Sequence, residues 1–180
     1  EVKAGFVTMV AANYLKPKES PDAWVVEVVN TMKMGDCDKL EKLLTSFFAS
    51  IPYSQRRKDD EREKERYFQY TFYLVIRMIS SFTVLIEKEQ SEGRVDCIIE
   101  TPMFVYIFEF KRDGSATEAL KQIEEKGYAR EYATDNRTIY LIGCNFSSKT
   151  GRLTTGSLRA KAFKKRVFFP IINSPWKGYA

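Results

Sequence analysis

Two acids and a lysine interrupt the otherwise apolar stretch GRVDCIIETPMFVYIFEFK, residues 93–111. Asp96, Glu109 and Lys111 stand among Cys, Ile, Val, Tyr and Phe, and Glu100 lies between the two acids. A buried charge is costly unless it is paired or binds a metal ion. Two carboxylates on neighbouring strands suit Mg²⁺ or Mn²⁺, and a nearby lysine can orient a water and stabilise charge on a phosphate. A salt bridge at a strand end is the alternative interpretation.

The absence of histidine narrows the chemistry further. Ser-His-Asp and Cys-His nucleophiles, histidine general bases and histidine-containing zinc sites are excluded. No GxxxxGK[ST] loop is present, so nucleotide binding by that route is excluded too. Any chemistry must come from carboxylates, lysine, tyrosine, hydroxyls or a metal ion held by oxygen ligands.

Composition predicts a globular protein that tolerates, without requiring, a polyanionic partner. The 180 residues are 44% hydrophobic, and the net charge is +5. Three cysteines without paired spacing are expected to be reduced thiols of a cytoplasmic protein. No signal peptide or membrane-spanning apolar run is visible. Because the first residue is Glu1, we expect the chain to be part of a longer protein.

Helical spacing predicts an N-terminal block of three helices, at residues 4–15, 21–34 and 37–51. Ser20 and Asp36 are suitable N-caps, and Gly35 is a suitable stop between the second and third helices. The mixed charges of residues 55–66 predict a solvated loop or exposed helix start, followed by a buried helix in the apolar run that follows.

Alternation and turn signals then predict three strands, at 82–90, 94–101 and 103–111, joined by short hairpin links. A helix over 116–133 and a buried strand over 137–146 follow. This order is typical of an α/β sandwich with a mixed central sheet. We divide the chain into a helical region (1–62), a core (63–150) and a basic and apolar tail (151–180). For the tail, a short helix, an arm or an edge strand all stay open.

Strand alternation predicts that the charged residues converge. Residues 94, 96, 98 and 100 would share one face of their strand, and 105, 107, 109 and 111 one face of the next. The 103–111 strand is apolar on both faces until Glu109, which indicates a central strand covered on both sides. A short hairpin would then bring Asp96, Glu109 and Lys111 together at the rim of the sheet.

At these residues the sequence resembles the PD-(D/E)XK nuclease superfamily, over about residues 1 to 148. It is most similar to a bacterial group in which this domain follows an AAA-type ATPase domain. Asp96 matches the first acid, although Val95 stands where the proline of the family name would be, and Glu109, Phe110 and Lys111 match the (D/E)-x-K triplet. The resemblance implies a restriction-endonuclease-like fold.

The resemblance also implies roles for the matching residues. Asp96 and Glu109 would bind Mg²⁺ or Mn²⁺, and Lys111 would position the attacking water. Glu65 would support the metal through water, and Gln122 would help to orient the site. Glu65 could instead only cap a helix, and Gln122 could only bridge helix and sheet.

The implied partners follow from the same resemblance. The substrate would be a nucleic acid, with DNA expected, and an AAA-type ATPase domain would belong to the full-length protein. A homodimer is expected and a membrane is not. A catalytically silent interaction or regulatory domain of a larger AAA-type ATPase protein is the alternative function, because fold does not determine activity. The basic residues of 159–166 could form a phosphate-binding arm or only a solvated stretch.

Overall fold

The computed structural model describes residues 21–50, 72, 73, 76, 82–147 and 158–163. Its centre is a five-stranded sheet in the order β1-β2-β3-β4-β5. The strands are β1 (Thr83–Gln90), β2 (Gly93–Glu100), β3 (Phe104–Arg112), β4 (Thr138–Phe146) and β5 (Leu158–Ala162).

The sheet is mixed, as the sequence predicts. β1, β2 and β3 form an antiparallel meander, β4 runs parallel to β3, and β5 runs antiparallel to β4. Parallel neighbours need a crossover connection, and α5 (Ala116–Lys126) supplies it between β3 and β4. β3 is therefore paired on both edges and covered on both faces, and its residues 105–110 are all buried.

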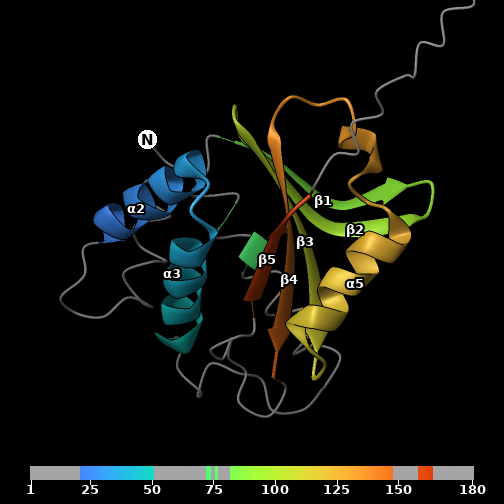
Figure 1. Ribbon diagram of the computed structural model, residues 1–180. Coiled ribbons are helices and arrows are strands. Elements are labelled where there is room, and N and C mark those ends of the chain that lie inside the picture. Colours follow the sequence, from blue (N-terminus) through green and yellow to red (C-terminus); the bar gives the residue numbers. More distant parts are fainter. Residues whose placement is uncertain (1–20, 51–71, 74–75, 77–81, 148–157, 164–180) are drawn as a thin grey trace, which may run out of the picture.

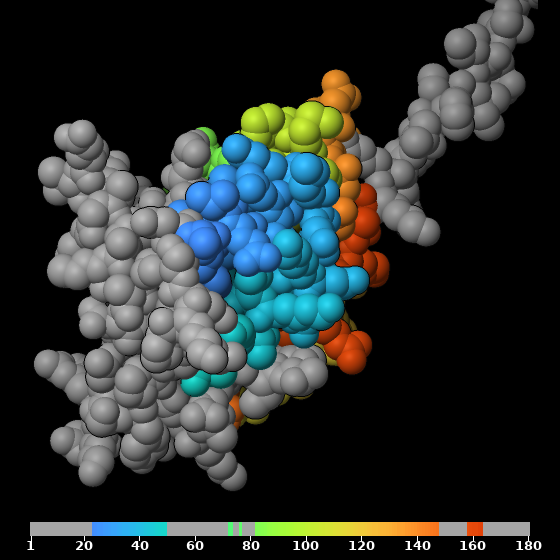
Figure 2. Space-filling model, turned by 90° about the vertical axis from the view of Figure 1, so that its left-hand side faces the viewer, coloured from blue at the N-terminus to red at the C-terminus, as the bar shows by residue number. Residues whose placement is uncertain are grey.

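Helices cover the two faces of the sheet (Figure 1). α2 (Pro21–Met34) and α3 (Cys37–Ser50) lie on one side, and α5 with the short 3₁₀ helix η2 (Arg130–Tyr132) lies on the other. Each face has its own apolar cluster, one under α2 and α3 and one under α5. Seen from the α2 and α3 side, these two helices form one continuous surface, with β5 emerging beside α3 (Figure 2).

Local signals explain where the first two helices meet. Gly35 has a φ of 72°, a left-handed conformation that glycine adopts without strain, and it ends α2. Asp36 then caps α3, because its Oδ1 accepts a hydrogen bond of 2.9 Å from the Lys39 N–H. Both predictions are confirmed. A Cβ on residue 35 would also collide with the Phe104 ring, so this turn is packed closely against the start of β3.

One prediction about an element is wrong. The helix expected over 116–133 ends at Lys126, because Gly127 takes a φ of 63° and its N–H donates to the Glu124 and Ile123 carbonyls. The residues that follow form η2 instead. For the tail, where a helix, an arm and an edge strand were all open, the structure shows the edge strand β5.

Some predictions lie outside the described residues. These include the helix at 4–15, the Ser20 cap, the charge run at 55–66 and most of the apolar run that follows it. Of that run, Phe72, Tyr73 and Ile76 are described, and they are helical and buried. Among the described residues, no helix is both long and apolar enough to cross a membrane.

Gly143 determines how closely α5 approaches the sheet. It lies on β4 directly beside Glu109 of β3. A Cβ at this position would overlap the Ala116 carbonyl oxygen and lie 2.9 Å from the Leu120 nitrogen, both in the backbone of α5. Ala116 and Ala119 are buried at the same contact. Only glycine lets the helix lie this close to Glu109.

We predict that Gly143→Ala lowers the free energy of unfolding by about 1–3 kcal/mol, because α5 must move away from β4. Urea denaturation followed by circular dichroism measures this change. Gly114→Ala is the matched control, because the one close contact of its Cβ would be with the flexible Glu118 carboxylate at 2.8 Å, and the Lys111 side chain would lie at an ordinary contact distance of 3.5 Å. Equal destabilisation by the two substitutions would contradict the prediction.

Candidate active site

Asp96 lies at the point where β2 separates from β3. The two strands pair from Glu100↔Val105 to Cys97↔Phe108, and the pairing stops there. Asp96 and Glu109 are the next residues on the two strands. In place of a ladder bond, the Phe110 N–H donates to Asp96 Oδ2 at 2.8 Å. The Asp96 carboxylate is thereby fixed against the backbone that carries Glu109.

In both strands of the β1–β2 hairpin, the alternation of side chains between the two faces of the sheet is also broken at the row that contains Asp96. On β2, Cys97 packs under α2 and α3, whereas Val95 packs under α5. On β1, Ile86 packs under α2 and α3, whereas Lys88 Nζ lies 5.7 Å from the Tyr132 ring centroid on the other side. The uninterrupted alternation that we predicted for residues 94–100 is therefore wrong. The break lies at the row of Asp96 and Glu87, where Glu87 takes a left-handed φ of 54°.

Glu109 is the buried acid of the site, with 3% of its surface exposed. Its Oε1 accepts a hydrogen bond from Gln122 Nε2, and Lys111 Nζ lies 3.8 Å from the same oxygen. Its Oε2 is buried and, within the described part of the chain, has no hydrogen-bond partner. Buried polar atoms are normally satisfied, so this oxygen is available to a ligand.

Lys111 and Gln122 complete the contacts around Glu109. Lys111 Nζ donates to Gln122 Oε1, so the Gln122 amide bridges the lysine and the acid. Gln122 projects from α5, whose N-terminus is capped by Ser115 through a 3.1 Å bond from the Glu118 N–H. The close packing at Gly143 holds this helix beside β3 and β4.

Burial raises the pKa of both acids. The pKa of Asp96 rises to about 6, mainly through burial, although the Phe110 N–H favours the charged form. The pKa of Glu109 rises to about 8, through burial and then through the charge of Asp96. Removal from water disfavours a charged carboxylate, and a second acid nearby adds to that cost. A bound cation would lower both pKa values by neutralising the repulsion.

The donor set suits a hard divalent cation. Mg²⁺ binds through one or two acids, with water and phosphate filling the other positions, and Glu109 has one oxygen without a hydrogen-bond partner among the described residues. The described residues do not contain a group of three acid, cysteine or histidine side chains placed to hold a metal together. Asp96 and Glu109 are the two acids of the site that could hold such a cation.

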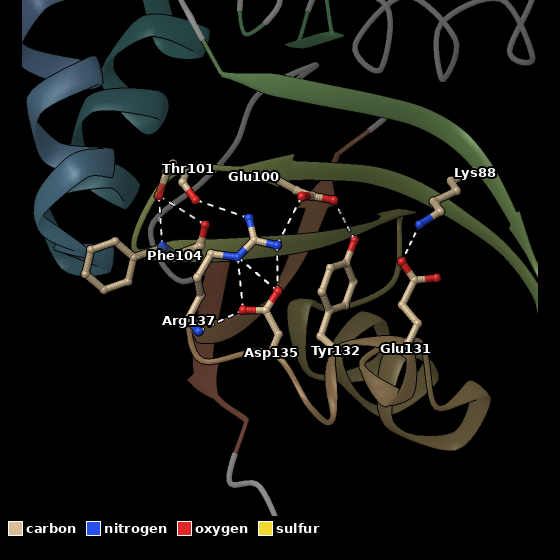
Figure 3. Close-up of polar contacts among 8 residues, drawn as sticks. All are labelled: Lys88, Glu100, Thr101, Phe104, Glu131, Tyr132, Asp135 and Arg137. Carbon is tan, nitrogen blue, oxygen red and sulfur yellow. Dashed lines mark hydrogen bonds and ion pairs between the residues drawn. The ribbon is translucent and has the colours of Figure 1, made fainter.

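Four of the five predicted site residues come together: Asp96, Glu109, Lys111 and Gln122. Glu65 lies outside the described residues. Glu100, which lies between the two acids in the sequence, belongs to a separate polar network (Figure 3). Arg137 Nη2 lies 3.1 Å from Glu100 Oε2, and the Tyr132 hydroxyl donates to Glu100 Oε1 at 3.0 Å.

Sequence reasoning missed two tyrosines that flank the acids from opposite layers. Burial and the charge of Asp96 raise the pKa of Tyr73, on the α2 and α3 side. Burial and the charge of Glu109 raise the pKa of Tyr128, whose hydroxyl donates to the Arg94 carbonyl at 3.0 Å on the α5 side. Sequence reasoning also missed Glu87 on β1. Only the strand register, which places Glu87 opposite Asp96, could have indicated it.

Comparison with known proteins shows a protein family and a relative that this chain resembles. The family described as the PD-(D/E)XK nuclease superfamily matches residues 63–155, which contain all four of these site residues. A protein from Azotobacter chroococcum mcd 1, described only as an uncharacterized protein in the vnfD 5' region, is 32% identical over 149 residues. That match covers 82% of this chain and 29% of the relative, so the chain spans less than a third of the relative's length.

The raised pKa values predict that the metal-free protein loses stability as the pH rises. The unfolded chain ionises Glu109 near the ordinary value of 4.5, whereas the folded chain keeps the proton up to about pH 8. Because the folded state binds the extra proton, the free energy of unfolding falls across this window, on the order of a few kcal/mol in total. Asp96 adds a fall of the same sign between 3.8 and about 6.

Urea denaturation in EDTA, at several pH values across this window, measures the slope. Glu109→Gln should flatten it, because the amide keeps the shape of the side chain and does not titrate. Glu118→Gln, at an exposed position of α5, should leave it unchanged. A wild-type slope that persists in Glu109→Gln would contradict our assignment of the slope to this carboxyl.

Proposed function

The chain belongs to the PD-(D/E)XK nuclease superfamily, and on that basis we propose that it is a metal-dependent nuclease that hydrolyses phosphodiester bonds of a nucleic acid. One observation carries the proposal. One oxygen of the buried Glu109 carboxylate has no hydrogen-bond partner among the described residues, and the Lys111 ammonium lies 3.8 Å from the other oxygen. A purely structural ion pair gains nothing from leaving that oxygen unsatisfied.

Asp96 and Glu109 are the residues that would hold the cation, and we propose Mg²⁺ or Mn²⁺. Members of this superfamily typically use divalent metals. When bound, such a cation polarises the phosphate and makes a nearby water more acidic. The charge of the cation would balance the negative charges of the two acids, which offsets the high cost of burying them.

Lys111 is the residue that we propose to act on the reacting groups. Its side chain is about one-third exposed, so the ammonium can reach a phosphate or a water at the edge of the site. Gln122 holds this ammonium beside Glu109 and is a positioning residue. We also propose that Glu65, which lies outside the described residues, supports the cation. DNA is the substrate that we propose, since the excess of positive charge tolerates a polyanion.

The much longer relative supports a wider context for this activity. A chain that matches less than a third of such a protein can be one domain of a larger protein. An AAA-type ATPase domain elsewhere in the full-length protein, a homodimer and a cytoplasmic location stay predictions. Size-exclusion chromatography with light scattering tests the homodimer directly.

We predict that the purified chain cleaves DNA in Mg²⁺ or Mn²⁺. Lys111→Ala should lower the rate by about 100-fold, because the substitution removes a charge that stabilises the reacting phosphate. Plasmid DNA, single-stranded DNA and RNA are incubated with each metal, and products are resolved on gels. Lys121→Ala is the matched control, since this lysine is exposed on α5 and pairs only with Glu125 among the described residues.

EDTA should abolish the cleavage, and Asp96→Ala should abolish metal binding measured by calorimetry. Cleavage that survives both EDTA and Lys111→Ala would come from a contaminant and contradict the proposal. Metal binding without cleavage of any substrate would favour the alternative, a regulatory domain of a larger ATPase protein. The absence of both would leave only the interaction function.

A further inference from the structure

Glu87 occupies a position that the proposed mechanism does not use. β1 and β2 pair on both sides of it, as Ile86↔Cys97 and Lys88↔Val95, and the row between them is unpaired. This row contains Glu87 and Asp96. The register is the same before and after the gap, so no residue has been inserted. Glu87 therefore lies directly opposite the first acid of the site, on the neighbouring strand.

The backbone of Glu87 is strained. Its φ is 54°, in the left-handed region, within a strand whose neighbours are extended. Glycine, asparagine and aspartate tolerate this region, and glutamate rarely adopts it. Strain of this kind is found mostly where function requires it. The same row is where both strands exchange their faces, which turns the hairpin toward η2.

Glu87 brings a further negative charge to the strand beside Asp96. The charge of Glu87 is balanced at present by Arg94, whose Nε lies 2.7 Å from Glu87 Oε2. Both side chains of that pair are well exposed, at 62% for Arg94 and 39% for Glu87, and exposed pairs contribute little stability. The ion pair alone does not account for the strained backbone.

An independent observation indicates a cation at the same place. Glu109 Oε2 is buried and has no hydrogen-bond partner within the described residues, and only 4% of the Glu109 side chain is exposed. Three negative side chains on adjacent strands, with one acceptor atom left open, form an environment that attracts a positive ion.

We infer that Glu87 is a third carboxylate of the cation site, a positioning residue that acts through its charge and through ordered water rather than by direct ligation. This inference rests on the proposed function. Direct ligation does not fit, because no three acids in the described residues are placed to hold a metal together. The left-handed backbone at Glu87 and its place opposite Asp96 are the geometric features on which this inference rests.

The test is calorimetric titration of the whole chain with Mn²⁺. Glu87→Gln should weaken Mn²⁺ affinity by about 10-fold, as expected for a residue that supports a metal from outside its ligand shell. Glu89→Gln is the matched control, because it makes the same charge change at an exposed position on the same strand. Arg94→Gln should keep or strengthen Mn²⁺ binding, since it removes a competing positive charge.

A second variant separates function from folding. Glu87→Gly removes the carboxylate and relieves the left-handed strain. The melting temperature of the metal-free protein should then equal or exceed that of wild type, while Mn²⁺ affinity falls as in Glu87→Gln. A purely structural role predicts the opposite pair of results, a lower melting temperature and unchanged affinity, and would overturn the inference.

The remaining outcomes are equally decisive. Wild-type Mn²⁺ affinity in Glu87→Gln overturns the inference and leaves the proposed nuclease intact. If Glu87→Gln and Arg94→Gln weaken Mn²⁺ affinity equally, Glu87 acts only by holding Arg94, and the inference is overturned as well. If wild type binds no Mn²⁺, this inference and the metal-dependent function fail together, which distinguishes that result from the others.

Discussion

The carboxylate of Glu109 is held almost entirely out of water in the middle of the sheet, and the surrounding structure is arranged to accommodate it. The Gln122 amide takes one oxygen, and the Lys111 ammonium lies close to the same atom. Asp96 nevertheless adds a second negative charge nearby, which makes ionisation of Glu109 still harder. A chain selected only for stability would place an apolar residue here. The arrangement becomes favourable once a cation is present.

The sheet makes room for these groups by parting two strands. The pairing of β2 with β3 ends at Cys97, so Asp96 and Glu109 are not paired. The Asp96 side chain accepts the hydrogen bond of the Phe110 N–H, which the separation would otherwise leave unsatisfied. On the other side of β3, glycine at position 143 lets α5 lie against the sheet and bring Gln122 to Glu109. The site is therefore formed by the end of the β2–β3 pairing on one edge of β3 and by the close packing of α5 at Gly143 on the other.

A second polar network in the same sheet shows the contrast. Arg137 makes ion pairs with Glu100 and Asp135 and also donates to the Thr101 carbonyl, and the Tyr132 hydroxyl satisfies the other oxygen of Glu100 (Figure 3). This network ties the β2–β3 turn to the start of β4, and both oxygens of its central acid are bonded. At the Glu109 site, one buried oxygen has no hydrogen-bond partner in the part of the chain that the structure describes. A carboxylate with both oxygens hydrogen-bonded is typical of a structural network, whereas a carboxylate with one oxygen available is suited to binding a ligand.

Local patterns in the sequence determined most of the elements and the identity of the central residues. Period and turn chemistry predicted α2, α3, the meander and β4, because these signals depend on neighbours in the chain. The spacing of Asp96, Glu109 and Lys111 was visible for the same reason. The tertiary structure alone decided that Leu158–Ala162 joins the sheet and that Glu87 faces Asp96. Those outcomes depend on backbone conformation and strand register, which are set by packing between segments far apart in the sequence.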